Sequence, residues 1–257
     1  MQYLSNQNKI IDFLENLRST EGEFIYLNYK KEIQNEESKI EETVKSEMIK
    51  REKSQIQENN EKEIENWQKA QTLNELFDCI KDCLKCPFGA TRNKFVFGVG
   101  NPNADIMVIG EGPGSDEDQQ GEPFVGRAGQ LLTKILSAIN LERDDVFIAN
   151  VVKCRPPGNK TPTESDFKEC LPYLLKQIEI IKPKFILTLG AVPLLALLGK
   201  DYKISKDRGK VIDYNGIKLI PTYHPAYLLR NPPAKKFVWE DVQLLEKMYN
   251  EIIKENK

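Results

Sequence analysis

Four short, nearly continuous apolar segments lie in the later part of the chain and predict buried β-strands. Such runs are typical of parallel strands that are covered on both faces. Between and after them, helical spacing predicts helices, and Thr163 followed by Asp166 predicts an N-cap. Because strand and helix alternate, the pattern predicts an α/β layered domain with a short parallel sheet. The predicted strands are Ala104–Gly110, Val146–Val152, Lys184–Gly190 and Lys218–Thr222, and the predicted helices are Ala128–Ile139, Glu164–Ile181, Val192–Leu198 and Lys235–Ile253.

The first 70 residues have a different texture. Between Gln7 and Gln71 there is one glycine and no proline, and the apolar residues are too sparse to fill a core. This pattern predicts a charged helix with a thin apolar stripe, a short coiled coil or a partly disordered segment. We therefore divide the chain into a charged extension, 1–70, and an α/β domain, 71–257, which is the candidate for any catalysis. The extension is interpreted as a solvated appendage, with a protein-binding arm as the alternative.

Charge and length sharpen this division. The 257 residues carry a net charge of -2, but residues 1–78 hold 11 basic and 17 acidic side chains, whereas residues 79–257 hold 26 and 22. The later part is therefore the basic one. Apolar residues make up 40% of the chain, which excludes wholesale disorder. No apolar run is long enough to cross a bilayer, and the N-terminus lacks a signal-peptide pattern. We expect a soluble, intracellular, cytoplasmic protein.

Five cysteines in a reducing compartment are poor candidates for disulfides and direct attention to metals. Cys83 and Cys86 form a C-x2-C pair, and Cys154 and Cys170 follow in a separate segment. Four thiolates suit a tetrahedral zinc or an iron–sulfur cluster, and spacing alone does not separate the two. The alternative is that Cys154 and Cys170 are ordinary buried thiols. Cys79 is interpreted as a packed thiol, with a ligand role as the alternative.

Polar residues follow the predicted strands, where ligands of parallel sheets bind. Glu111 stands in a glycine-rich turn that matches neither a Walker A loop nor a dinucleotide-binding fingerprint. Asn150 lies inside an apolar strand, where it either caps the local backbone or reads a planar ligand. His224, the single histidine, precedes a proline, and Phe124 lies on a glycine-flanked loop. Taken alone, a lone histidine is more often structural, and such an aromatic is more often a core residue.

Together, the motifs GEGPG, PFVGRAGQ, NVVKCRPPGN and HPAYLLR resemble the family-4 uracil-DNA glycosylases, the iron–sulfur branch of their superfamily. The similarity runs from about Cys83 to Tyr249 and includes four cysteines in order. The resemblance implies a three-layer α/β/α fold with a short, mainly parallel, four-stranded central sheet. It also implies excision of uracil from DNA, which leaves an abasic site for base-excision repair. A structural [4Fe–4S] cluster would be bound by Cys83, Cys86, Cys154 and Cys170.

The resemblance also assigns roles within the site. Glu111 resembles the acidic residue that orients the attacking water, and His224 the residue that donates to uracil O2. Phe124 resembles the aromatic on which uracil stacks, Asn150 the amide that pairs with its N3–H and O4 edge, and Glu117 the residue against C5. Gly112 belongs to the uracil-binding set, although the family's first motif commonly reads GEAPG; we expect this departure to loosen the loop.

DNA contacts are predicted from the basic balance of the later part and from the Tyr-Leu-Leu-Arg quartet, which resembles an apolar wedge with a phosphate-binding cation. The resemblance implies that the substrate is uracil-containing DNA, single- or double-stranded, and we expect a monomer. One alternative is a relative that stays covalently attached through an additional histidine, which this sequence lacks; another is a nucleic-acid-binding module without catalysis. The predicted contacts are Lys153, Arg155, Tyr227, Leu228, Leu229 and Arg230, with Lys160, Arg208 and Lys210 as further phosphate candidates.

Overall fold

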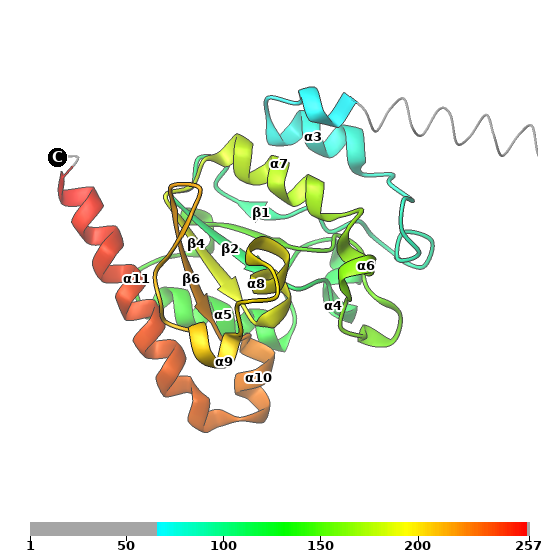
Figure 1. The fold of residues 1–257 in the computed structure, drawn as a ribbon. Helices are drawn as coiled ribbons and strands as arrows, with labels where there is room; N and C mark the ends of the chain where they lie inside the picture. Colours follow the sequence, from blue (N-terminus) through cyan, green and yellow to red (C-terminus); the bar gives the residue numbers. More distant parts are fainter. Residues whose placement is uncertain (1–65, 256–257) are drawn as a thin grey trace, which may run out of the picture. The chain divides into compact units, whose positions relative to one another are not determined.

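A six-stranded mixed sheet lies at the centre of the fold (Figure 1). The computed structural model describes residues 66–255, with side chains to Ile252. The strand order is β1-β3-β2-β4-β6-β5, in which the four inner strands are parallel and the two edge strands are antiparallel to their neighbours. The inner strands are β2 (Ile106–Gly110), β3 (Phe147–Asn150), β4 (Phe185–Leu189) and β6 (Ile217–Thr222), and the edges are β1 (Val99–Gly100) and β5 (Ile212–Tyr214).

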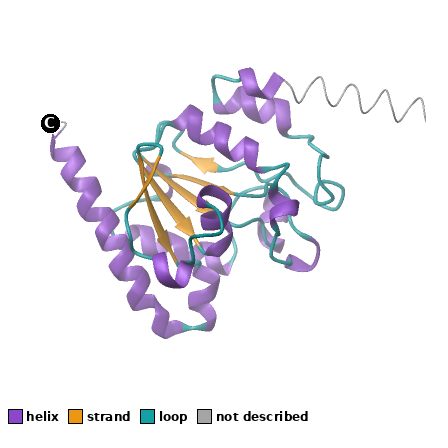
Figure 2. Cartoon of the chain, in the orientation of Figure 1, coloured by secondary structure: helices purple, strands orange, loops and turns teal. Residues whose placement is uncertain are grey.

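Helices occupy both faces of this sheet (Figure 2). Short 3-10 turns at Trp67–Lys69, Arg143–Asp145, Pro157–Asn159 and Pro232–Ala234 connect several of them. The α-helices are α3 (Leu73–Ile80), α4 (Ser115–Gln120), α5 (Arg127–Ser137), α6 (Glu164–Phe167), α7 (Leu171–Ile181), α8 (Ala191–Leu198), α9 (Ile204–Asp207), α10 (Pro225–Arg230) and α11 (Lys235–Glu255).

The side-chain alternation of β2 divides the core into two layers. Met107 and Ile109 pack in one apolar cluster with residues of α3, α7 and α8, whereas Ile106 and Val108 pack in the other with residues of α5, α10 and α11. Successive side chains of a strand point to opposite faces, so each inner strand serves both clusters. The predicted α/β/α fold is confirmed, with six strands in place of four.

The two additional strands are short and lie at the edges of the sheet. β5 and β6 form a hairpin whose turn residues, Asn215 and Gly216, both have positive φ. Asn-Gly is a strong signal for such a turn, although the adjacent strand has only three residues. β1 has two residues and pairs antiparallel with β3. Neither edge carries the long apolar run that identified the inner strands.

The predicted helix over Glu164–Ile181 is wrong in one respect, because it is divided into α6 and α7. Pro172 stands in the first turn of α7, where its missing N–H is tolerated. In the middle of a continuous helix it would remove a hydrogen bond and clash with the preceding turn. The predicted cap of α6 is confirmed: the Asp166 carboxylate accepts hydrogen bonds from the Thr163 backbone N–H and hydroxyl.

The predicted extension lies outside the described residues up to position 65, and its division from the catalytic domain at 70/71 stays a prediction. In the described part, Ala70 is buried and Trp67 packs edge-on against Tyr173 with ring centroids 5.2 Å apart. The packed core thus includes side chains that precede the predicted boundary. No helix among residues 66–255 is long and apolar enough to span a membrane.

Candidate active site

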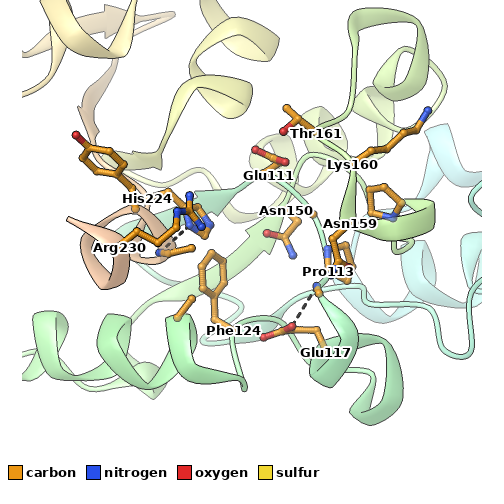
Figure 3. A pocket seen from close by; sticks show the side chains of 16 residues that line it. Glu111, Pro113, Glu117, Phe124, Asn150, Asn159, Lys160, Thr161, His224 and Arg230 are labelled. Carbon is orange, nitrogen blue, oxygen red and sulfur yellow. Dashed lines mark hydrogen bonds between the residues drawn. The ribbon is translucent and has the colours of Figure 1, made fainter. Parts of the chain in front are cut away.

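A pocket of about 440 Å³ opens at the carboxyl ends of the parallel strands (Figure 3). Glu111 directly follows β2, Asn150 ends β3 and His224 lies two residues after β6. Phe124 reaches the same space from the loop between α4 and α5. Parallel strands bring residues that are distant in sequence to one edge of a sheet. The structure thus brings these predicted residues together, along with Gly112 and Glu117, which also line the pocket.

Asn150 presents an unsatisfied acceptor at the base of this pocket. Its side chain is 2% exposed, and its Oδ1 has no hydrogen-bond partner among the described residues. Such an atom costs roughly 1–3 kcal/mol unless a ligand or water satisfies it. Gly110 leaves room for the amide, since a Cβ at that position would lie 2.5 Å from Asn150 Oδ1 and from the Phe124 ring. No N–H of the described residues donates to this oxygen, so Oδ1 does not cap the local backbone, and the binding of a ligand by Asn150 stays a prediction.

Phe124 occupies a turn with left-handed backbone geometry, at φ 55°. The Arg143 guanidinium donates to the Pro123 carbonyl at 2.8 Å and to the Phe124 carbonyl at 3.2 Å. Gly129 is also required, because a Cβ there would overlap the Phe124 backbone. Positive φ is uncommon for a bulky residue and persists where surrounding contacts hold it. The aromatic ring is therefore fixed by its neighbours at the wall of the pocket.

Glu117 holds the same turn from the other side. Its Oε1 accepts hydrogen bonds from the N–H groups of Val125 and Gly126 at 3.0 and 2.9 Å, and its Oε2 accepts from Gly114 N–H at 3.1 Å. The carboxylate thus joins the loop after β2 to the Phe124 turn. The placement of Glu117 against C5 of the base stays a prediction. Both of its carboxylate oxygens accept backbone hydrogen bonds that hold the loop.

His224 caps α10 through its imidazole. Its Nδ1 accepts a hydrogen bond from Ala226 N–H at 3.1 Å, so in the neutral ring the proton resides on Nε2. Burial, followed by the nearby positive charge of Arg230, lowers the pKa of His224 to about 4. The Phe124 and His224 ring centroids are 5.5 Å apart. The geometry therefore supplies a neutral N–H donor beside the aromatic wall.

Glu111 and Gly112 line another side of the pocket. Burial raises the pKa of the half-buried Glu111 carboxyl above its usual range. At Gly112 an added Cβ would lie 2.5 Å from Val152 Cγ2. The glycine therefore fits the valine beside it, and an alanine would require Val152 to move.

Four cysteines lie in or against the apolar cluster on the face of the sheet opposite α11. Cys154 and Cys170 are buried, and Cys83 and Cys86 are partly buried against the same apolar cluster. Burial raises the pKa of Cys154 to about 11 and that of Cys170 to about 12, and neighbouring Cys86 adds to both rises. The fifth, Cys79, is partly buried and packs against this cluster.

Three of the four cysteines have hydrogen-bond partners among the described residues. Arg92 Nη1 donates to Cys154 Sγ at 3.3 Å, Lys153 N–H donates to Cys170 Sγ at 3.3 Å, and Cys83 Sγ lies 3.4 Å from Tyr173 Oη. Within the described range, no three or more His, Cys, Asp or Glu side chains are grouped closely enough to hold a single metal ion. The thiols are thus neighbours without a preformed single-ion site.

Comparison with known proteins gives this geometry a family. The model of the uracil DNA glycosylase superfamily matches residues 97–246. The chain belongs to this superfamily. A type-4 uracil-DNA glycosylase of Thermotoga maritima is 49% identical over 168 residues, covering 64% of this chain and 88% of that protein. One of Pyrobaculum aerophilum is 43% identical over 182 residues, covering 67% and 92%. A type-5 enzyme of the latter organism is 31% identical over 147 residues, covering 50% and 64%. The resemblance inferred from the motifs is confirmed.

Two predicted DNA contacts of this superfamily member are wrong. Lys153 is 0% exposed, and its ammonium donates to the Asn150 carbonyl and to Gln177 Oε1. Leu228 is 1% exposed and packs in the cluster with α5 and α11. A basic or apolar residue next to a motif can point inward, and sequence adjacency does not reveal its direction. Neither side chain can touch DNA without local unfolding.

The other predicted contacts are more accessible. Tyr227 and Leu229 are 38% and 39% exposed, and Arg230 and Lys160 lie at the rim of the pocket. Arg155 donates to Asn159 Oδ1 at 2.8 Å, and Lys210 pairs with Asp207 at 2.8 Å. Arg208 is held by the buried Asp241 and by the Phe237 carbonyl, which makes it a poor phosphate ligand. Arg143 was not predicted from the sequence. Its role is visible only in the structure, where its guanidinium donates to two backbone carbonyls of the Phe124 turn.

We expect adjacent leucines of α10 to respond differently to truncation. Leu228→Ala should lower the free energy of unfolding by about 2–5 kcal/mol, because it leaves a cavity in a closed core. Leu229→Ala should change it by no more than about 0.5 kcal/mol. Urea unfolding of both variants measures the difference, and equal values would contradict the placement of Leu228.

The single histidine permits a direct test of the site's electrostatics. Because the pKa of His224 is lowered to about 4 from the ordinary 6.5, the unfolded state takes up its proton first as pH falls. His224 alone should therefore favour unfolding progressively between pH 6.5 and about 4, with no contribution at higher pH. An NMR titration of the imidazole protons should show a midpoint well below 6.5, and a midpoint at or above 6.5 would contradict a neutral donor.

Proposed function

We propose that the protein is a monofunctional uracil-DNA glycosylase, which extrudes uracil from DNA and hydrolyses its N-glycosidic bond. The unsatisfied Oδ1 of Asn150, which lines one pocket with Glu111, Phe124 and His224, is the observation that carries this proposal. The type-4 uracil-DNA glycosylases to which the chain is similar support it. The product is an abasic site, which base-excision repair then processes.

Asn150 provides the base selectivity. Its amide has an acceptor oxygen beside a donor nitrogen, which complements the N3–H and O4 of uracil. Cytosine reverses this order, because it has an acceptor at N3 and a donor at N4. A buried amide left facing the wrong edge loses its hydrogen bonds, so cytosine is disfavoured. Extruding the nucleotide costs a few kcal/mol, and stacking on Phe124 offsets part of that cost.

His224 and Glu111 act on opposite charges of the transition state. Bond cleavage leaves negative charge on the departing uracil and positive charge on the deoxyribose. The neutral imidazole donates from Nε2 to uracil O2, while the Glu111 carboxylate orients the attacking water and favours the cationic sugar. Groups that are already oriented toward such charges stabilise them with little reorganisation. Glu117, Gly112 and Phe124 complete the uracil-binding set by shaping the pocket.

We assign a [4Fe–4S] cluster to Cys83, Cys86, Cys154 and Cys170. Four thiolates are the ligand set of such a cluster, and each would bind a separate iron. This fits thiols that gather in one region but are not grouped around one ion. When bound, the cluster supplies a structural crosslink between the segment after α3, the loop after β3 and the start of α7. It takes no part in the bond cleavage proposed above.

DNA binding uses accessible basic and apolar side chains, of which Lys160, Tyr227 and Arg230 line the pocket. Arg155, Arg230, Lys160 and Lys210 are phosphate ligands in this proposal, and Tyr227 with Leu229 forms the apolar wedge. Phosphate contacts of this kind position the protein without reading sequence. The DNA is single- or double-stranded, the enzyme acts as a monomer, and a protein partner would bind through residues 1–70.

The assignment is tested by cleavage of an oligonucleotide that carries one uracil, beside thymine and cytosine controls. Only the uracil strand should be cut after alkaline treatment. Glu111→Gln and Asn150→Asp should each lower the rate by ~10²-fold or more, because each removes preorganised electrostatics. Asn103→Asp, an exposed change of the same kind as Asn150→Asp, is the matched control. Full activity in both site variants would overturn the assignment.

Metal analysis tests the cluster separately. Protein purified without oxygen should be brown and contain about four iron and four sulfide per chain. Cys154→Ser should lower both contents and the brown absorbance together. Stoichiometric zinc without iron would contradict the cluster.

A further inference from the structure

Lys153 is a buried cation that the proposed reaction does not use. It is 0% exposed and lies three residues after Asn150, which ends β3. Its Nζ donates to the Asn150 carbonyl at 3.0 Å and to Gln177 Oε1 at 2.5 Å. No carboxylate of the described residues forms an ion pair with it. A buried ammonium without a counter-ion is costly, so its retention calls for a physical reason.

The same residue contacts the cysteine region through its backbone. Lys153 N–H donates to Cys170 Sγ at 3.3 Å, and Lys153 directly precedes Cys154 in the chain. A cluster with four thiolate ligands carries net negative charge, which would supply the missing counter-ion. Hydrogen bonds and charges around the sulfurs are also what tune such centres.

The Lys153 backbone and the Gln177 side chain are each held by a further hydrogen bond. Val96 N–H donates to the Lys153 carbonyl at 2.9 Å, which fixes the backbone. Gln177, fully buried in α7, donates from Nε2 to the Phe97 carbonyl at 3.0 Å while its oxygen accepts from Lys153. Movement of the Asn150 peptide would therefore disturb contacts that extend to Cys170.

We infer that Lys153 is a positioning residue that couples the cysteine-bound metal centre to the uracil-reading amide of Asn150. The inference rests on the proposed function and on the proposed cluster. Lys153 does not touch the base; its ammonium holds the carbonyl of the residue that does, and its N–H holds a metal-binding sulfur. Loss of the ammonium should thus weaken uracil recognition and metal retention together.

The experiment compares Lys153→Met with Lys176→Met in the loaded protein. Lys176 is also a buried lysine, 6% exposed, but it pairs with Glu179 at 2.8 Å and has no described bond to Asn150 or a cysteine. Three quantities are measured: inhibition by free uracil, iron release to a chelator, and affinity for DNA that already contains an abasic site.

For Lys153→Met we expect the uracil inhibition constant and the rate of iron release each to rise by ~10–100-fold, the range for residues that orient metal ligands. Affinity for abasic DNA should stay within about twofold, because the phosphate contacts lie elsewhere. Lys176→Met should resemble wild type in all three. A change in uracil inhibition alone, in iron release alone, or an equal change in the control would overturn the coupling.

If Lys153→Met yields no soluble protein, the same measurements on Gln177→Met test the inference. It keeps the ammonium but removes one of its acceptors, so both quantities should change in the same direction by a smaller factor, ~3–10-fold. Wild-type values for both would overturn the inference. Failure of the wild-type protein to release uracil is a different result, which would remove the proposed function itself.

Discussion

The site depends on the parallel pairing of four strands in the order β3-β2-β4-β6. β2, β3 and β4 are buried along their whole length, and β6 over its last four residues, and the polar residues of the site lie at or just beyond the carboxyl ends of these strands. Glu111, Asn150 and His224 are far apart in sequence and meet only because those ends coincide. The register of β2 with β3 pairs Gly110 with Asn150, and the missing side chain of the glycine gives the amide its space.

The ring of Phe124 is fixed in another way. Its backbone has positive φ, and the turn that contains it is held by hydrogen bonds with two charged side chains, Glu117 and Arg143. Glu117 accepts three backbone N–H bonds on one side of the turn, and Arg143 donates to two carbonyls on the other. These bonds compensate for the unfavourable φ of Phe124, and Gly129 permits the close approach of the following helix. The ring is therefore preorganised before a base arrives, which lowers the ordering required on binding.

The break between α6 and α7 has a comparable consequence for the cysteines. Pro172 prevents one continuous helix, and the interruption leaves Cys170 at the start of α7, buried near Cys154. Lys153 then lies between this region and Asn150. Lys153 thus links Cys170, a proposed metal ligand, to Asn150, the proposed base-reading residue, through one hydrogen bond from its backbone N–H and one from its ammonium.

The sequence by itself determined the inner strands, the layered fold, the α6 cap and the identities of the strand-end residues. Local periodicity and residue type carry that information, because burial on both faces selects continuous apolar runs and because polar chemistry is possible only where a strand ends. Neither the Asn215-Gly216 turn nor the short β5 beside it was predicted.

Only the tertiary structure decided where Lys153 and Leu228 point, that Arg208 is already paired, and that Arg143 holds the Phe124 turn. Each of these outcomes depends on a partner distant in sequence: Gln177 for Lys153, the α5 and α11 core for Leu228, Asp241 for Arg208. The sequence does not show whether a lysine or leucine beside a functional motif faces solvent or the core. Its direction is set by which neighbours can satisfy its charge or exclude water from its surface, and those neighbours are assembled only by folding.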